Sequence, residues 1–117
     1  MFINLTNHPF ELWDEKQQEE ARKYGEVEDL TFPVVLPEAS SDEVQKLAET
    51  YAAFIAKKAA CEPVVVHVMG EMTFTYAIVS QLKAMNITCL ASTTERNTLL
   101  IDGKKVSEFK FVRFREY

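Results

Sequence analysis

Cysteine, glycine and long apolar runs are all scarce in this sequence, and each scarcity excludes a class of protein. The 117 residues contain two cysteines, Cys61 and Cys89, and neither has a second cysteine nearby. This excludes a CxxC redox motif and a zinc knuckle, and we expect both thiols to be free, as in a cytoplasmic protein. The three glycines form neither a GxGxxG fingerprint nor a GK[ST] phosphate-binding loop.

The sequence also lacks a segment that would enter a membrane. No apolar run approaches the roughly 20 residues that span a bilayer. The opening segment Met1–Thr6 is too short for a signal peptide and carries no basic residues. We therefore expect a cytoplasmic protein without a membrane partner.

Positive charge is limited and unevenly distributed. The formal net charge is −5, with a net −7 over residues 1–62 and a net +2 over residues 63–117. A negative chain binds long nucleic acid poorly, because phosphate neutralisation supplies most of that affinity. The net charge of +2 over residues 63–117 leaves open the binding of a small anion by this half of the chain. No group of His, Asp, Glu or Cys has metal-ligand spacing, so we expect no metal and no cofactor.

The pattern of apolar residues predicts one α/β domain over residues 1–117. Four expected strands alternate with three expected helices, and a hairpin around Asp102-Gly103 follows. The strands are expected over residues 1–6, 27–32, 63–68 and 87–91, the helices over 15–24, 41–58 and 72–85, and the hairpin strands over 98–101 and 106–114. This alternation predicts three layers around a mainly parallel sheet of order 2-1-3-4, with the C-terminal β-hairpin at its edge. Pro63–Val68 is apolar on both faces, as is typical of a central strand.

Ligands of such sheets bind outside the carboxyl ends of the strands. We therefore expect the site in the loops after the first, third and fourth strands, which contain Asn7-His8, Gly70–Thr73 and Ser92–Asn97. The last of these segments is expected to be an exit loop over Ser92–Arg96, rich in hydroxyl groups.

Several residues of these loops have both a functional and a structural interpretation. Gly70 either lets a ligand approach the backbone or forms a tight turn with positive φ. Thr73 either contacts the ligand or bonds within the helix terminus. Glu71 either acts as a general base or favours the dipole of the helix it begins.

The basic side chains divide in the same way. Arg96 offers forked donors to a phosphate, or pairs with Glu95 or another acid on the surface. His8 either serves the ligand or caps nearby backbone, whereas His67, within an apolar strand, is expected to be buried and hydrogen-bonded.

Aromatic and basic residues interleave in the tail, over 108–117. This pattern fits single-stranded nucleic acid, but better fits a strand with its aromatics inward. A phase change at Phe111-Val112 indicates a β-bulge or a partner surface.

Four segments together resemble a known family. Ile3–Pro9 (INLTNHP), Val68–Tyr76 (VMGEMTFTY), Ser92–Asn97 (STTERN) and Phe111–Tyr117 (FVRFREY) are similar to small Rossmann-like proteins of type III CRISPR loci. That family resembles the ring nucleases, which bind and open cyclic oligoadenylate messengers, and the CARF sensor domains.

The resemblance implies a homodimer that holds a cyclic oligoadenylate across the strand carboxyl ends. It implies metal-independent cleavage, in which a ribose 2′-hydroxyl attacks the adjacent phosphorus and leaves a 2′,3′-cyclic phosphate. The alternative is a CARF-like module that senses the nucleotide, or contacts a protein, without cleaving anything. The expected catalytic residues are His8, Glu71 and Arg96, and the expected ligand-binding residues are Asn7, Gly70, Met72, Thr73, Ser92, Thr93, Thr94 and Asn97. Glu71 departs from what a phosphate site favours, because a carboxylate repels phosphate.

Overall fold

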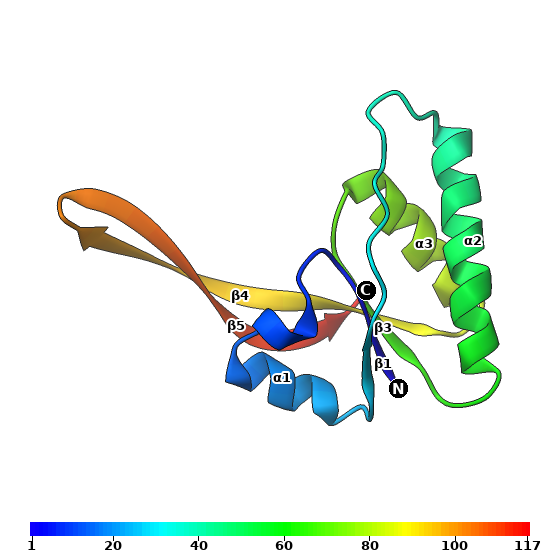
Figure 1. The fold of residues 1–117 in the computed structure, drawn as a ribbon, viewed down its shortest axis with the longest axis horizontal. Coiled ribbons are helices and arrows are strands. Elements are labelled where there is room, and N and C mark those ends of the chain that lie inside the picture. Colours follow the sequence, from blue (N-terminus) through cyan, green and yellow to red (C-terminus); the bar gives the residue numbers. More distant parts are fainter.

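The chain folds around one five-stranded sheet, and the computed structural model describes all of residues 1–117 (Figure 1). The strands are β1 (Phe2–Leu5), β2 (Val27–Asp29), β3 (Val65–Val68), β4 (Thr88–Ile101) and β5 (Lys104–Glu116). The helices are α1 (Glu15–Arg22), α2 (Ser41–Ala59) and α3 (Met72–Ala84), with a short 3₁₀ turn at Phe10–Leu12. The strand order is β2-β1-β3-β4-β5. The first four strands are parallel and β5 is antiparallel to β4, so the predicted α/β class, strand order and edge hairpin are confirmed.

Helices cover both faces of the sheet, which gives the three predicted layers (Figure 1). The larger core lies between the sheet and the α2–α3 pair, where Phe74, Ile55 and Val66 are fully buried. On the other face α1 covers a smaller cluster around Phe2 and Leu90. Successive strand residues alternate between these two faces, so β1 and β3 are buried on both sides.

Side-chain caps directly precede the expected helix starts at positions 15 and 41. The Asp14 carboxylate accepts from the Gln17 N–H at the start of α1, and the Ser40 hydroxyl accepts from the Glu43 N–H at the start of α2. Gly25 follows α1 with a φ of +114°, a conformation that only glycine adopts without strain. These local signals fix where the crossovers leave and re-enter the sheet.

The structure corrects the expected exit loop over Ser92–Arg96. This segment is part of β4, which continues without a break from the sheet to Ile101. Beyond Leu90 it pairs only with β5, so the two strands form a ribbon that projects from the body of the molecule (Figure 1). Ten residues of strand span about 30 Å, which agrees with the elongated 50 × 38 × 21 Å dimensions of the molecule.

The ribbon contains the predicted β-bulge. Thr93 pairs with Arg113 and the next residue, Thr94, pairs with Phe111, so Val112 has no partner on β4. The extra residue explains why Phe111 and Phe114, three positions apart, lie on the same face of β5. That face is the one that α1 covers closer to the body of the molecule.

None of the three α-helices combines the length and the apolar character needed to cross a bilayer. Cys61 is exposed, Cys89 is buried, and both are free thiols as predicted.

Candidate functional site

A chain of buried polar side chains crosses the α1-facing side of the sheet near its carboxyl edge. Asn4 on β1 is the register partner of His67 on β3, and Ser92 lies on β4 beside them. Asn4 and His67 are 1% and 3% exposed, in strands whose other residues are apolar. Buried polar groups in such positions are expected to be hydrogen-bonded, and these are.

The Asn4 amide is fully engaged, which fixes its orientation. Its Nδ2 donates to the backbone oxygen of His8 and to Asp29 Oδ1, both at 2.8 Å. Its Oδ1 accepts from the Thr6 hydroxyl at 2.9 Å and lies 3.1 Å from His67 Nδ1. Because this oxygen can only accept, His67 Nδ1 must carry the proton.

His67 is therefore a neutral imidazole whose other nitrogen, Nε2, accepts. Burial lowers the pKa of His67 to about 4. Aromatic rings enclose it, with the centroids of Phe2, Trp13 and Phe114 between 5.2 and 5.9 Å away. The prediction of a buried, hydrogen-bonded His67 is confirmed.

Ser92 connects the hydrogen-bonded pair of Asn4 and His67 to the surface. Its Oγ lies 2.7 Å from His67 Nε2, so the hydroxyl donates its only proton to the imidazole. The same oxygen accepts from Gln17 Nε2 at 3.1 Å. The Ser92 proton thus points towards the buried imidazole. The Ser92 oxygen can still accept one more hydrogen bond on its outer side.

A hollow of about 590 Å³ opens over Ser92 and His67. It lies where the chain leaves β1 towards β2 on one side and leaves β3 towards β4 on the other, the point at which doubly wound sheets bind ligands. Polar and aromatic residues make up most of its lining: Thr6, Asn7, His8, Leu12, Trp13, Asp14, Gln17, His67, Met69, Gly70, Ser92, Thr94, Phe109 and Phe111.

Backbone donors without an acceptor in the chain lie at this edge. They include the N–H groups of Thr6 and Asn7, just after β1, and of Gly70, just after β3. Free amides at the ends of neighbouring parallel strands suit an anionic ligand. No group of three or more His, Cys, Asp or Glu side chains is arranged so that it could hold a metal ion.

The structure brings together five of the predicted site residues: Asn7, His8, Gly70, Ser92 and Thr94 line the hollow. Arg96 lies two residues beyond Thr94 on the same face of the ribbon. Thr93 and Asn97 alternate onto the opposite face, where the Thr93 hydroxyl bonds the backbone of Arg113.

Glu71, Met72 and Thr73 lie outside the hollow, at the start of α3. The Glu71 carboxylate caps that helix by accepting from the Thr73 hydroxyl and from the backbone N–H groups of Thr73 and Phe74. These bonds, the Thr73 hydroxyl first, lower the pKa of Glu71. The arrangement matches the structural interpretation of both Glu71 and Thr73.

Packing explains Gly70. Its φ is not positive, so the alternative of a tight turn with positive φ is wrong. A Cβ atom at this position would overlap the ring of Phe32, with Cε1 only 2.8 Å away. Gly70 is therefore required so that Phe32, which is 4% exposed, can cover the turn between β3 and α3.

Arg96 is exposed and forms no ion pair, so the alternative of a surface pair with Glu95 or another acid is wrong. Its guanidinium lies 5.9 Å from the centroid of the Phe109 ring and donates to the Ser107 hydroxyl from Nη2 at 3.1 Å. The cation is held along the ribbon by contacts that leave its charge uncompensated.

Asn4, Trp13 and Gln17 are not among the site residues predicted from the sequence. Asn4 is a polar residue in an apolar strand, as His67 is, and two such residues in neighbouring strands are a recognisable signal. Their pairing depends on the strand register, and Ser92 joins them only because β4 continues past the sheet.

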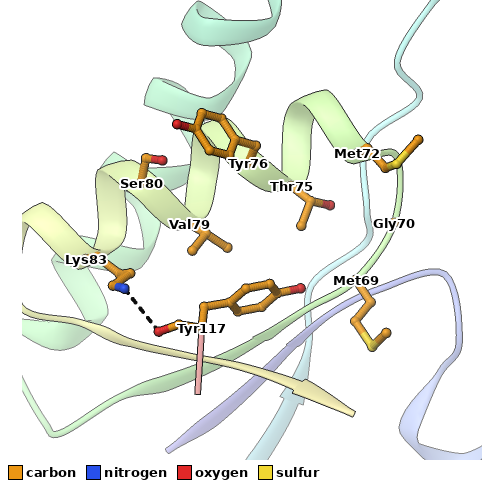
Figure 2. Close-up of a pocket in the computed structure, with 9 residues that line it drawn as sticks. All are labelled: Met69, Gly70, Met72, Thr75, Tyr76, Val79, Ser80, Lys83 and Tyr117. Atoms are coloured by element: carbon orange, nitrogen blue, oxygen red, sulfur yellow. Dashed lines mark hydrogen bonds between the residues drawn. The ribbon is translucent and has the colours of Figure 1, made fainter. Parts of the chain in front are cut away.

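A second hollow of about 500 Å³ lies on the other side of the sheet, between α3 and the end of β5 (Figure 2). The Tyr117 ring lies below Thr75 and Val79, and Lys83 Nζ donates to the backbone oxygen of Tyr117 at 3.0 Å. The side chains around it are mostly apolar, with Lys83 the only charged one. The first hollow, with its imidazole, hydroxyl and amide groups, is the better candidate site.

Residues 1–115 match the family described as the uncharacterized protein MJ1673 family, and the chain belongs to it. No curated protein and no solved structure matches the chain.

Proposed function

We propose that this member of the MJ1673 family is a cytoplasmic, homodimeric ring nuclease that binds a cyclic oligoadenylate and opens it without a metal ion. One observation carries the proposal. The hollow at the switch point of the sheet combines free N–H donors, an imidazole, hydroxyl groups and aromatic rings. Free N–H donors suit phosphates, imidazole and hydroxyl groups can hydrogen-bond to ribose hydroxyls, and aromatic rings can stack on purine bases.

The proposed reaction is a transesterification within the nucleotide. The ribose 2′-oxygen attacks the neighbouring phosphorus and the bond from phosphorus to the 5′-oxygen breaks. The proton of the 2′-hydroxyl is taken up by a base, and the leaving 5′-oxygen receives a proton from an acid. The products are a 2′,3′-cyclic phosphate and a free 5′-hydroxyl.

His8 and Arg96 take the main roles in this proposal. His8 lines the hollow and transfers a proton, whereas the Glu71 carboxylate is engaged in capping α3. Arg96, on the same ribbon face as Ser92 and Thr94, stabilises the charge that grows on the phosphoryl oxygens.

The test is incubation with cyclic tetra-adenylate in EDTA, followed by mass spectrometry of the products. Linear products ending in a 2′,3′-cyclic phosphate support the proposal. Binding without cleavage identifies the alternative, a CARF-like sensor, and absence of binding refutes a nucleotide function altogether.

Arg96→Ala locates the site, with Arg113→Ala as the matched control. Loss of a charge-assisted contact costs about 1.5–3 kcal/mol, which lowers binding or cleavage by about 10- to 150-fold. Arg113 pairs with Thr93 and lies on the opposite face of the ribbon, so its loss changes little. Equal losses in both variants would indicate unspecific attraction of the nucleotide.

The ribbon supports the homodimer. It extends past the carboxyl edge beside the hollow and carries five exposed apolar residues, which are Leu99, Leu100, Ile101, Val106 and Phe109. A two-stranded ribbon that packs on nothing is marginally stable in water. A second copy meeting this edge would cover the ribbon and bring two hollows around one two-fold symmetric ring.

Leu100→Glu tests this arrangement, because Leu100 is 75% exposed on the ribbon. Leu36→Glu is the control, a leucine of 60% exposure in the segment before α2. Sedimentation at micromolar concentrations is expected to give a dimer for the unmodified protein and for Leu36→Glu, and a monomer for Leu100→Glu. A monomeric unmodified protein would refute the dimer.

A further inference from the structure

We propose that Ser92, with His67 behind it, is the base of this site, accepting a proton from the ligand hydroxyl that attacks. This inference rests on the ring-nuclease function proposed above. It assigns a role to three residues, Ser92, His67 and Asn4, that form one hydrogen-bonded chain on neighbouring strands.

The direction of the chain follows from valence. Asn4 Oδ1 has no proton to give, so it accepts from His67 Nδ1–H, and the neutral ring then presents a lone pair at Nε2. Ser92 donates into that lone pair at 2.7 Å. The Ser92 oxygen can therefore accept a further proton from the hollow while passing its own to His67.

The proton balance is complete within the site. The ligand 2′-hydroxyl gives its proton to Ser92 Oγ as the Ser92 proton moves to His67 Nε2. The 2′-oxygen bonds to phosphorus, and the 5′-oxygen leaves with a proton from His8, which lines the same hollow. The imidazolium of His67 then returns its extra proton through Ser92 to water, and His8 regains one from water.

The surroundings of His67 make it a weak base, which is neutral at physiological pH and can therefore accept a proton. Aromatic rings pack around it, and Asn4 supplies an uncharged oxygen where a carboxylate would hold the imidazolium firmly. The titratable groups that surround this site are His8 and Asp14, which line the hollow with His67, and Asp29, which accepts a hydrogen bond from Asn4. Burial keeps the pKa of His67 near 4, so the ring is unprotonated at neutral pH.

Ser92 is positioned to touch the ligand, whereas His67 acts through it. If Ser92 is purely structural, its replacement lowers stability and ligand affinity. If Ser92 is the base, its replacement lowers the rate of the chemical step. The two roles are separated by measuring affinity and single-turnover cleavage of cyclic tetra-adenylate in the same variants, at saturating protein.

Ser92→Ala is expected to lower single-turnover cleavage about 100-fold while affinity stays within about threefold, in the range known for general-base catalysis. Ser92→Thr keeps the hydroxyl and is expected to restore most of the rate. Ser80→Ala is the matched control, a serine that lines the other hollow. In the unmodified protein the acid limb of the rate profile is expected near pH 4, because His67 must be neutral to accept.

The tautomer of His67 is read independently by long-range ¹H–¹⁵N correlation NMR of the protein alone, where the proton is expected on Nδ1. A proton on Nε2 at neutral pH would overturn the inference whatever the cleavage result. Cleavage at an unchanged rate in Ser92→Ala would overturn it while leaving the ring-nuclease function in place. Absence of cleavage by the unmodified protein would refute that function, and this role of Ser92 with it.

Discussion

Replacing Gly70 by alanine tests whether the turn between β3 and α3 is shaped by packing. The added Cβ would meet the Phe32 ring well inside van der Waals distance, with Cε1 at 2.8 Å and Cζ and Cε2 closer still. Ordinary carbon contacts are about 3.5–4 Å, so the ring must move by roughly 1 Å. Phe32 cannot move freely, because it is 4% exposed and packs edge-on against Phe74 at 5.1 Å.

Overpacking of this kind costs about 1–3 kcal/mol, so we expect Gly70→Ala to lower the free energy of unfolding by that amount. Phe32→Ala alone removes a buried ring and is expected to cost about 3–5 kcal/mol. In the double variant the methyl group occupies space that the ring has left. The combined loss should therefore be smaller than the sum of the two losses by about 1–2 kcal/mol.

Urea denaturation of the four proteins, followed by circular dichroism, measures this coupling directly. Gly103→Ala is a control for backbone strain, since Gly103 has a φ of +75° and open space where a Cβ would lie. The free energy of unfolding lost in Gly103→Ala should be the same with and without Phe32→Ala. Additive losses for Gly70→Ala and Phe32→Ala would refute the packing explanation of Gly70.

The remaining predictions concern pH, a helix cap and a terminal hydrogen bond. Because His67 has a pKa of about 4 when folded and near 6.5 when unfolded, the unfolded chain binds more protons between these values, and stability should fall by about 3 kcal/mol from pH 6.5 to pH 4. His67→Gln should flatten this slope in thermal melts, and an unchanged slope would assign it to other groups. The lowered pKa of Glu71 means that its cap is fully formed above pH 4.5 and is lost as the carboxylate protonates at lower pH. Glu71→Ala should therefore lower the melting temperature at pH 7 and have less effect in acid; an equal effect at both would contradict the cap. Tyr117→Phe removes the hydroxyl that donates to the Val68 carbonyl, and should cost about 1 kcal/mol in urea denaturation, whereas no loss would show that water replaces this bond.

The overall fold could be predicted because its signals are local. Caps such as Asp14 and Ser40 and the alternation of strands with helices depend on neighbouring residues alone. The central position of β3 followed from Pro63–Val68, which is apolar on both faces. Right-handed crossovers then leave few arrangements of four parallel strands.

The continuation of β4 could not be predicted in the same way. Ser92–Asn97 is polar on both faces, and a polar run without apolar alternation is typical of a loop. Its strand conformation depends on β5, which pairs with it from the far side of the hairpin turn. Thr93 and Thr94, which are β-branched, were the local indication of a strand.

The candidate site was predicted in its position but only partly in its residues. The carboxyl-edge rule identified His8, Gly70 and Ser92, because it depends only on the order of the elements. The chain from Asn4 through His67 to Ser92 depends on which strands are neighbours and in which register. A buried histidine was expected, but its two partners lie 63 and 25 residues away along the sequence.

The bulge at Val112 affects the direction of the ribbon without affecting which aromatic residues share one of its faces. With Val112 left out of the pairing, Phe109, Phe111 and Phe114 share one face, as they would in a regular strand that lacked this residue. What Val112 adds is a local bend and extra twist, and these set the direction in which the outer ribbon points. Deleting Val112 would keep the aromatic residues in the wall of the hollow and change the direction in which the ribbon points. The chemistry of the site and the direction of the ribbon can therefore be varied independently.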